Sequence, residues 1–295
     1  MEFSSKDKAA ILVEALPYIQ KFFGKTIVIK YGGNAMVNNE LKAKVMEDIA
    51  LMKYVGIRPV VVHGGGPDIT GFLQKIGKKS EFVSGLRVTD EETVQIAEMV
   101  LVGKVNTEIV SLLNHRGVKA VGLSGKDAEL IRAKKKLAEV YEGETVRMVD
   151  IGFVGEVEKI NVDILNDLLD QDYIPVIAPI GVGANNESYN INADYVAAEV
   201  AGALHAEKLL LLTDIEGIYK DYHDKTTFVS TLTQDEAKEM IKDGTIAGGM
   251  IPKVEACLCS LEAGAGKTHI IDGRLDHSLI LEVFTPQGIG TEVVR

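Results

Sequence analysis

Residues 59–67 read PVVVHGGGP, and this stretch indicates the class of fold. A short run of valines is typical of a buried parallel strand, and glycines followed by proline are typical of a turn that enters a helix. Residues 26–33, TIVIKYGG, begin in the same way, with an apolar strand that ends in glycines. Ligands of open α/β sheets bind beyond the carboxyl ends of parallel strands, so both glycine clusters indicate a binding site at that edge.

The two glycine clusters are suited to binding phosphate. Glycine turns let backbone N–H groups approach an anion closely, and a following helix adds N–H donors and a partial positive charge. Lys30 adds a cation at the end of the first strand. Either cluster alone could equally be an ordinary turn. Two clusters at equivalent strand ends, with a lysine beside one of them, favour a phosphate site.

Short apolar runs alternate with longer segments of helical period along most of the chain. This pattern predicts an α/β fold with a mostly parallel central sheet between two layers of helices. The expected strands are residues 26–30, 59–63, 118–122, 173–178, 208–213 and 268–272. The expected helices are residues 38–54, 91–114, 163–169, 193–204, 234–242 and 252–263.

Residues 129–157 interrupt the alternation. The segment is charged and contains Gly143, Gly152 and Gly155, so it predicts a strand hairpin that forms a rim or lid beside the sheet. Repeats and linker-like tracts do not stand out elsewhere. We therefore expect one continuous chain with two lobes that meet near residues 180–190.

Composition limits the class of protein and of partner. The 295 residues are 46% hydrophobic and 25% charged, as in an ordinary globular enzyme, and the formal net charge of −11 disfavours nucleic acid and anionic membranes as main partners. Cys257 and Cys259 form no disulfide framework and no zinc cluster. The sequence shows neither a signal peptide nor an apolar run of membrane-spanning length, so we expect a soluble, cytoplasmic protein.

Two familiar nucleotide motifs are absent or incomplete. Residues 265–268, AGKT, imitate the end of a P-loop, but Leu261 stands where the motif needs glycine, and a helix precedes and a strand follows. A dinucleotide fingerprint after the first strand is missing, which leaves an NAD-dependent enzyme as the weaker alternative. The histidines show no metal-ligand spacing, and we interpret them as surface or packed residues.

Five motifs occur in order along the chain: KYGGNAM (30–36), VHGGGP (62–67), GLRVT (85–89), NINAD (190–194) and GGMIPK (248–253). Together they resemble the amino-acid kinase family, and within it the branch that phosphorylates N-acetylglutamate. Aspartokinases share the Lys-x-Gly-Gly strand end, and UMP and carbamate kinases share the sandwich. The combination of VHGGGP, GLRVTD and NINAD separates this chain from those siblings.

The resemblance implies that ATP phosphorylates the side-chain carboxylate of N-acetyl-L-glutamate, which is the second step of arginine biosynthesis. The chemistry agrees, because a carboxylate with a pKa of ~4.3 is already ionised at neutral pH and needs no general base. Aminoadipate-type or carrier-linked acceptors, an aspartokinase-like acceptor, and a non-catalytic regulator that binds nucleotide and amino acid remain alternatives.

The resemblance assigns catalysis to Lys30, Lys253 and Asp194. The two lysines would neutralise the moving phosphoryl group from the acceptor side and the nucleotide side, and the aspartate would hold both ammonium groups. Without the motif, Asp194 would more simply be a residue at a helix N-terminus.

The resemblance also implies two sets of binding residues, in an acceptor lobe of residues 25–183 and an ATP lobe of residues 184–295. Arg87 would clamp the α-carboxylate with its planar fork, and Asn190 and Asn192 would recognise the acetamido group. In isolation, Arg87 could be a surface charge and Asn190 a turn residue. The acceptor set is Gly65, Gly66, Arg87, Asn190 and Asn192. The phosphate and ATP set is Gly33, Gly64, Thr213, Asp214, Gly217, Ile218, Tyr219, Thr245, Ile246 and Ala247.

Mg²⁺ is expected to accompany ATP, held largely by the nucleotide and water, with no separate protein metal site and no prosthetic group. Two details depart from the family pattern. Tyr195 follows the NINAD aspartate, where the family often has Thr or Gln, and residues 219–227, YKDYHDKTT, form a longer and more charged loop than expected. These departures concern the nucleotide loop rather than the reaction.

Residues 1–24 predict an apolar N-terminal helix, in which Pro17 causes a kink or break near residues 13–16. The helix could dock on its own core, or it could pair with another subunit. The resemblance favours pairing with another subunit, because in arginine-inhibited members of the family such helices interlace between dimers to make a hexameric ring. It implies an arginine site made by Tyr18, Lys208, His269, Glu282, Gly288 and Gly290.

Overall fold

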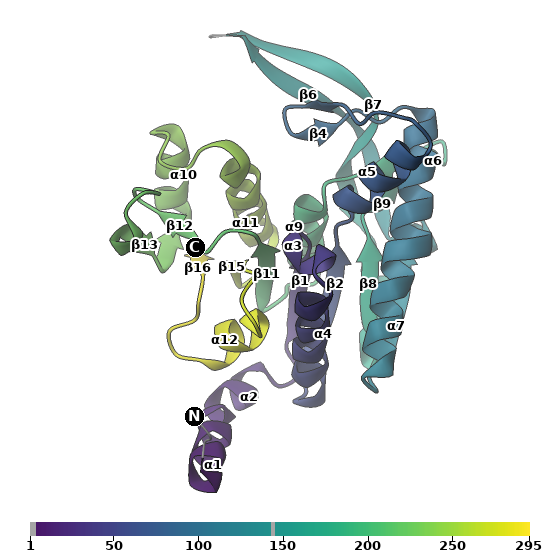
Figure 1. The fold of residues 1–295 in the computed structure, drawn as a ribbon. Coiled ribbons are helices and arrows are strands. Elements are labelled where there is room, and N and C mark those ends of the chain that lie inside the picture. The colour runs from purple at the N-terminus through teal and green to yellow at the C-terminus, as the bar shows by residue number, and fades with distance from the viewer. Residues whose placement is uncertain (1–3, 143–144) are drawn as a thin grey trace.

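The structure is a computed structural model that describes residues 4–142 and 145–295. Its centre is an eight-stranded sheet in the order β14-β16-β15-β11-β1-β2-β8-β5, in which neighbouring strands are parallel except β15 and β16 (Figure 1). The strands of this sheet are β1 (Thr26–Tyr31), β2 (Arg58–His63), β5 (Ala120–Ser124), β8 (Ile174–Ala178), β11 (Lys208–Thr213), β14 (Thr231–Thr233), β15 (Lys267–Asp272) and β16 (Thr291–Val294).

The central strands are buried because helices cover both faces of the sheet. One core joins the sheet to α2 (Leu16–Phe22), α4 (Asn39–Tyr54), α5 (Gly66–Lys75) and α12 (Ser278–Phe284), with the long helical segment 91–115. The other core joins the sheet to α8 (Asp163–Asp170), α9 (Ala193–Ala203), α10 (Gln234–Lys242) and α11 (Ile251–Ala263). The predicted three-layer sandwich is therefore confirmed.

Most predicted elements have the observed bounds. The strands expected at 26–30, 59–63, 173–178, 208–213 and 268–272 are confirmed to within one residue. The strand expected at 118–122 is wrong by two residues, since β5 begins at Ala120. Gly117 has a φ of +82° and ends the preceding helix, and Asn114 Oδ1 accepts a hydrogen bond from the Ala120 N–H at 2.8 Å. The chain therefore enters the sheet only after this turn.

The single helix expected at 91–114 has three parts. α6 (Glu91–Glu98) continues into a π-helix, η1 (Met99–Asn106), and then into α7 (Thr107–His115). The wide turns of a π-helix change which side chains face the sheet, and such turns occur often at functional sites. A prediction of one uniform α-helix is wrong in this respect.

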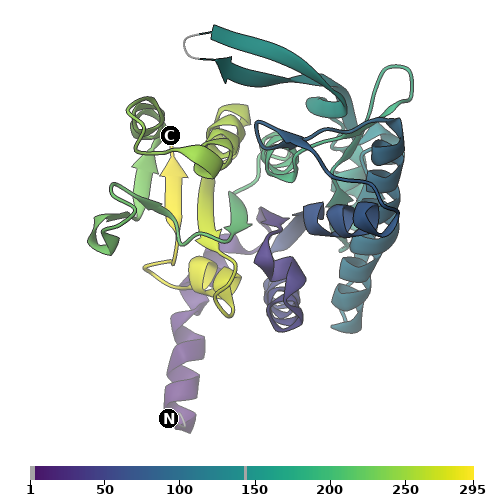
Figure 2. The ribbon, with the colours of Figure 1, turned by 45° about the horizontal axis from the view of Figure 1, so that its top comes forward.

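The charged segment forms the expected hairpin. Strands β6 (Ile131–Glu142) and β7 (Thr145–Ile160) pair antiparallel, and their bases close a small barrel with β9 (Ile180–Val182) and β10 (Ser188–Asn190). The hairpin projects beyond the sheet in both views (Figures 1 and 2), near the short strands β3 (Phe82–Val83) and β4 (Leu86–Arg87). Residues 143 and 144, including the predicted turn residue Gly143, lie outside the described residues. The role of the β6–β7 hairpin as a rim or lid stays a prediction.

The N-terminal helix breaks where Pro17 predicts. α1 (Ser5–Glu14) ends at Ala15, and α2 begins at Leu16 with Pro17 in its first turn. Every residue of α1 is exposed, and the helix points away from the body (Figure 2). α2 packs on the sheet through Phe22, which is 2% exposed. Docking on the chain's own core therefore describes α2 and not α1, and residues 1–3 of the predicted segment lie outside the described residues.

The remaining short elements are α3 (Asn34–Val37), η2 (Asp127–Glu129), β12 (Ile218–Tyr219), η3 (Lys225–Thr227), β13 (Phe228–Val229) and η4 (Gly248–Met250). The expected division between residues 183 and 184 falls between β9 and β10 and stays a prediction. Within residues 4–142 and 145–295, no helix is long and apolar enough to cross a membrane.

Candidate active site

Three charged residues from distant parts of the chain meet at the carboxyl edge of the sheet. Lys30 lies near the end of β1, Asp194 in the first turn of α9, and Lys253 in the first turn of α11. The distance from Asp194 Oδ1 to Lys30 Nζ is 2.9 Å, and that from Asp194 Oδ2 to Lys253 Nζ is 3.1 Å. Each oxygen of one carboxylate therefore holds one ammonium group.

The two lysines keep Asp194 ionised inside the protein. Burial, with 5% of the residue exposed, would raise the pKa of the carboxyl group, but the charges of Lys30 and Lys253 outweigh burial and lower that pKa. With two cations and one anion, the cluster carries a net positive charge. Such a site attracts a multiply charged anion.

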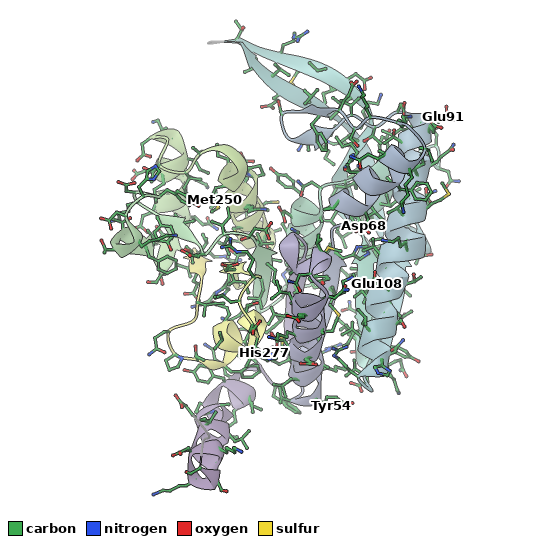
Figure 3. The ribbon with its side chains drawn as sticks, viewed as in Figure 1. Tyr54, Asp68, Glu91, Glu108, Met250 and His277 are labelled. Atoms are coloured by element: carbon green, nitrogen blue, oxygen red, sulfur yellow. The ribbon has the colours of Figure 1, made fainter. Side chains whose placement is uncertain are left out.

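Two cavities meet at Lys30 and Gly33, which line both. The smaller cavity, about 270 Å³, lies between the glycine turns, β4, β10 and the start of α9. The larger cavity, about 590 Å³, lies between the end of β11, β12 and the start of α11. Met250, labelled in Figure 3, lines the larger cavity from the segment that leads into α11. Two ligands, one in each cavity, would therefore meet beside Lys30.

Arg87 lines the smaller cavity and is braced by its neighbours. Its Nη1 donates to Ser80 Oγ at 2.6 Å, and its Nη2 donates to the Gly66 carbonyl at 3.0 Å and to Thr70 Oγ1 at 2.8 Å. The guanidinium carbon lies 4.8 Å from the centre of the Phe82 ring. Arg87 is only 8% exposed, so the surface-charge reading is wrong.

The glycines of residues 64–66 bring backbone close to the smaller cavity. The Gly64 N–H donates to the Tyr31 carbonyl at 2.8 Å, and Gly65 is the N-cap of α5, so the first N–H groups of that helix face outward from its end. A Cβ at Gly66 would have Arg87 Nη2 as its nearest neighbour, at 4.0 Å. Gly64, expected with the ATP set, lines the smaller cavity and not the larger one.

Asn190 and Asn192 also line the smaller cavity. Asn192 caps α9, because its Oδ1 accepts a hydrogen bond from the Asp194 N–H at 2.8 Å. This bond leaves the amide NH₂ group as the part of Asn192 that a ligand could use. The neighbouring Tyr195 donates its hydroxyl to Glu255 Oε2 at 2.7 Å, and Lys136 from the hairpin lies 4.7 Å from its ring centre.

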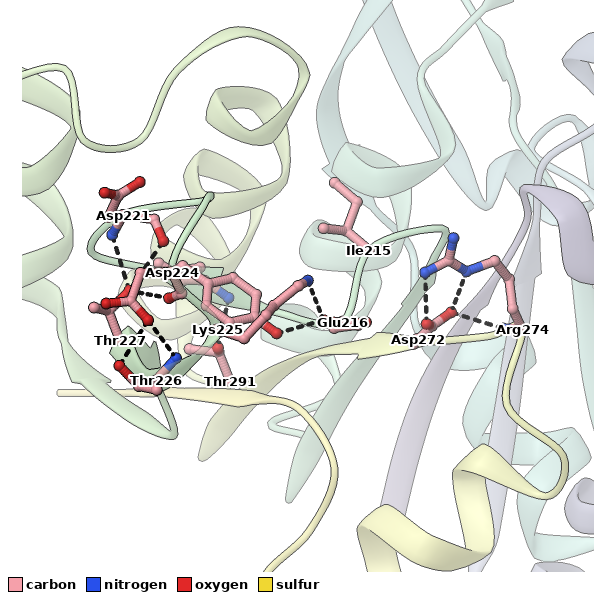
Figure 4. A network of polar contacts seen from close by, with 12 residues as sticks. Ile215, Glu216, Asp221, Asp224, Lys225, Thr226, Thr227, Asp272, Arg274 and Thr291 are labelled. Atoms are coloured by element: carbon pink, nitrogen blue, oxygen red, sulfur yellow. Dashed lines mark hydrogen bonds and ion pairs between the residues drawn. The ribbon is translucent and has the colours of Figure 1, made fainter.

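Every residue of the predicted ATP set except Gly64 lines the larger cavity: Gly33, Thr213, Asp214, Gly217, Ile218, Tyr219, Thr245, Ile246 and Ala247. Its charged loop is ordered by its own side chains (Figure 4). Lys225 Nζ lies 2.5 Å from Glu216 Oε2 and 4.5 Å from the Tyr219 ring centre, and Thr291 Oγ1 accepts from the Ile218 N–H at 2.8 Å. Two residues of the loop that departs from the family pattern, Tyr219 and Tyr222, thus line this cavity.

The sequence did not indicate several residues that hold Arg87 or line the larger cavity. Ser80, Thr70 and Phe82 hold Arg87, and Tyr222, Gly249 and Met250 line the larger cavity. A buried arginine needs acceptors for its five N–H groups, which could have directed attention to nearby hydroxyls. Which hydroxyls are near depends on the fold, so the sequence could not name them.

A third cavity, which neither Lys30 nor Lys253 lines, lies between α2, α12 and β16. Its volume is about 590 Å³, and its lining includes all six residues of the predicted arginine set: Tyr18, Lys208, His269, Glu282, Gly288 and Gly290. Glu282 is buried there. Its Oε1 lies 2.6 Å from His269 Nδ1, and its Oε2 accepts from the Ile289 and Gly290 N–H groups at 2.7 and 3.1 Å.

The AGKT segment, which imitates the end of a P-loop, lies in the wrong structural context for that motif. Residues 265–268 follow α11 and run into β15, so a helix precedes and a strand follows. Lys267 forms an ion pair with Glu292 at 2.9 Å and lines the third cavity. Among the histidines, His63 and His269 are buried, as a packed reading predicts.

Comparison with known proteins places these features in a family. The model of the amino acid kinase family matches residues 25–272. The acetylglutamate kinase of Heliobacterium modesticaldum is 60% identical over 290 residues, which are 98% of this chain and 98% of that protein.

Two solved structures of N-acetylglutamate synthase from Neisseria gonorrhoeae are similar in fold. The complex with coenzyme A and N-acetyl-glutamate has a TM-score of 0.83 and 28% identity, and covers 97% of this chain and 63% of that one. The complex with coenzyme A and L-arginine has a TM-score of 0.79 and 26% identity, and covers 97% of this chain and 65% of that one. This chain therefore spans slightly less than two thirds of the synthase. The family match over residues 25–272 and the full-length identity to a kinase establish that the chain belongs to the amino acid kinase family.

Proposed function

We propose that the protein transfers the γ-phosphoryl group of ATP to the side-chain carboxylate of N-acetyl-L-glutamate, in arginine biosynthesis. The full-length similarity to acetylglutamate kinases supports this acceptor. The observation that carries the proposal is the pair of lysines held by Asp194 where the two cavities meet. A kinase whose acceptor is a carboxylate needs charge neutralisation more than it needs a base.

The reaction uses these residues as follows. Arg87 and the two asparagines orient the acceptor in the smaller cavity. A carboxylate oxygen attacks the γ-phosphorus, the bond to the β-γ bridging oxygen breaks, and ADP leaves with that electron pair, which gives an acyl phosphate. Lys30 and Lys253 neutralise charge on the moving group from its two sides, and Asp194 keeps both ammonium groups aimed at it.

Magnesium would accompany the nucleotide and supply further positive charge on its phosphates. Asp214 lines the larger cavity near the lysines, and a Cβ at Gly33 would lie 2.6 Å from its Oδ1. A carboxylate oxygen is a ligand that Mg²⁺ accepts directly or through water. The residues present therefore fit a nucleotide that carries Mg²⁺.

An ADP-release assay with several acceptors tests this proposal. We expect turnover with N-acetylglutamate and little with glutamate, aspartate, UMP or carbamate, and N-acetylaminoadipate should be included as the nearest analogue. ATP with Mg²⁺, and not NADH, should raise the melting temperature. Binding of ATP without turnover of any acceptor would favour a non-catalytic regulator, and preference for UMP or aspartate would assign the chain to a sibling activity.

The finer proposal concerns regulation and assembly. We infer that α1 pairs with α1 of another dimer to build a hexamer, because Ile11, Leu12, Val13 and Leu16 on and just after this helix are 47–74% exposed. The third cavity, beside α2, would then bind arginine as the inhibitor. The related synthase solved with L-arginine supports this ligand class.

The free thiols of Cys257 and Cys259 agree with a reducing, cytoplasmic location.

Two truncations and one substitution test regulation. Deletion of residues 1–14 removes α1, whose residues are all exposed, and should turn hexamers into dimers with weaker arginine inhibition and unchanged catalysis. Deletion of residues 1–22 also removes buried Phe22, so it should cost stability as well. Glu282→Ala should reduce arginine sensitivity without changing assembly. A full-length dimer that ignores millimolar arginine would refute regulation and leave the kinase proposal intact.

A further inference from the structure

His63 is a buried side chain for which the proposed reaction has no use so far. It is the last residue of β2, lies directly before the glycine turn, and is 0% exposed. Its Nδ1 lies 2.7 Å from the Gly64 carbonyl oxygen, and its Nε2 lies 3.1 Å from Asn106 Nδ2. The imidazole therefore connects the glycine turn to the π-helix beneath it.

The neighbours of this histidine decide where its proton lies. Asn106 Nδ2 also donates to the Val176 carbonyl at 2.8 Å. A carbonyl oxygen can only accept, so the amide NH₂ faces Val176 and His63, and Nε2 must be the unprotonated nitrogen. The Gly64 carbonyl can likewise only accept, so Nδ1 carries the proton. Burial lowers the pKa of His63 to about 4, although the Gly64 bond and Asp68 oppose this effect, and the ring stays neutral at neutral pH.

The direction of the Gly64 carbonyl fixes the direction of the next N–H group. The described residues contain no cis peptide bond, and in a trans peptide the C=O and the following N–H point in opposite directions. The carbonyl of Gly64 faces buried His63. The N–H of Gly65 therefore points away from that core, and Gly65 lines the smaller cavity.

The π-helix explains how Asn106 reaches this place. Asn106 is the last residue of η1, is 3% exposed, and contacts both β2 and β8 through the amide. A Cβ at Gly122 would collide with Asn106 Oδ1, so the glycine of β5 makes room for the amide. The π-helix and the glycine at position 122 thus together allow the buried Asn106 amide to contact His63.

We propose that His63, held by Asn106 as the Nδ1–H tautomer, is a positioning residue that aims the Gly65 N–H at the phosphoryl group. The role rests on the proposed function, because the N–H needs a transferring phosphoryl group to act on. Glycine has little conformational restraint of its own, so an unheld peptide at this position would adopt several orientations. His63 removes that freedom before the substrates bind.

Nitrogen NMR of the wild-type protein tests the tautomer without any assay. Long-range ¹H–¹⁵N spectra should show His63 with a protonated Nδ1 and a bare Nε2, unchanged between pH 5.5 and 8. A proton on Nε2 overturns the proposal. Because this measurement needs no substrate, it also separates failure of the positioning role from failure of the kinase proposal.

Matched substitutions test the consequence for catalysis. His63→Asn keeps an N–H donor near the Nδ1 position, whereas His63→Gln places its amide near the Nε2 position, and His63→Leu removes both. We expect His63→Gln and His63→Leu to lose roughly 10- to 100-fold in kcat with both KM values within about twofold, and His63→Asn to lose far less. Asn106→Leu should resemble His63→Gln and disturb the NMR signature. Folded His63→Gln and His63→Leu proteins with wild-type kcat, or equal loss in all three variants, would overturn the positioning role.

Discussion

The two cavities beside Lys30 are built differently. The smaller one is lined by groups that the fold fixes in advance, with Arg87 bonded to Ser80, Thr70 and Gly66. The larger one has more than twice the volume, and much of its wall is loop, including Ile215, Tyr222 and Thr245. A site for a small, specific acceptor gains from fixed polar groups, because each one excludes molecules that cannot pair with it. A nucleotide site depends more on a complementary shape and on contacts to the phosphates than on many fixed polar side chains.

The largest effect should come from the cluster that both cavities share. Lys30→Ala and Lys253→Ala should each lower kcat on the order of 10²-fold or more, with little change in either KM, because a cation is lost from the transition state. Steady-state kinetics with both substrates varied would measure this. Lys238→Ala is the control, since Lys238 pairs with Glu262 on the surface. A lysine variant with near wild-type kcat would place that lysine outside the reaction.

The second effect should be confined to the acceptor side. Gly66→Val should abolish most activity, because its side chain would project into the smaller cavity toward Arg87, and Gly71→Val on the same helix should not, because a Cβ at Gly71 meets open space. Gly65→Val is a poorer test of the cavity than Gly66→Val. A Cβ at Gly65 would collide with Leu101 in the core, so lost activity there would also report damaged packing. Melting temperatures of all three variants would separate the two causes.

A smaller and one-sided effect is expected for Arg87→Lys. A lysine offers a point charge in place of a planar fork and cannot make the bonds to Ser80, Thr70 and Gly66 together. The KM for the acceptor should rise by roughly tenfold, while the KM for ATP stays within about twofold. Thr70→Val should move the acceptor KM in the same direction by less. Equal weakening of both substrates would show that Arg87 does not belong to the acceptor cavity alone.

The sequence predicted the parts of this molecule that depend on local pattern. The strand at 208–213 and the helix at 234–242 have the observed bounds, since four consecutive leucines lie between Lys208 and Thr213, and Thr233 with Glu236 forms a capping box. The lysine and aspartate motifs were also grouped correctly, although the family resemblance and not the spacing supplied that grouping. The roles of the grouped residues stay predictions.

Parts that depend on tertiary contacts were beyond the sequence. The π-helix within 91–115 has no periodic signal that distinguishes it from an α-helix, and it decides that Asn106 faces His63. His63 was correctly interpreted as packed, but its partner lies 43 residues away on a different element. The braces of Arg87 come from α5 and from the segment before β3, and only the fold shows that these surround one guanidinium.

The last prediction concerns a contact away from both cavities, where α4 packs against α12 and His277 is the N-cap of that helix (Figure 3). Asp48 on α4 is 1% exposed, its Oδ1 lies 2.6 Å from His277 Nδ1, and burial raises its pKa to about 6 despite the bond to His277. The folded protein therefore holds this proton more tightly than the unfolded chain, whose aspartate has a pKa of ~3.9. Stability from this group is complete below pH ~4 and is lost as pH rises through about 6.

The substitution Asp48→Asn removes the titrating carboxyl group, so the variant does not lose this stability as the pH rises. Between pH 4 and pH 8, its unfolding free energy relative to wild type should therefore rise by about 2–3 kcal/mol. Urea unfolding at several pH values would measure it. Asp276→Asn is the control, because Asp276 pairs with Lys44 at the surface and should give a nearly flat difference. Parallel profiles for Asp48→Asn and wild type would show that the carboxyl group titrates normally. Turnover should not change in either variant, because Asp48, His277 and Asp276 are not among the residues that line the two cavities beside Lys30.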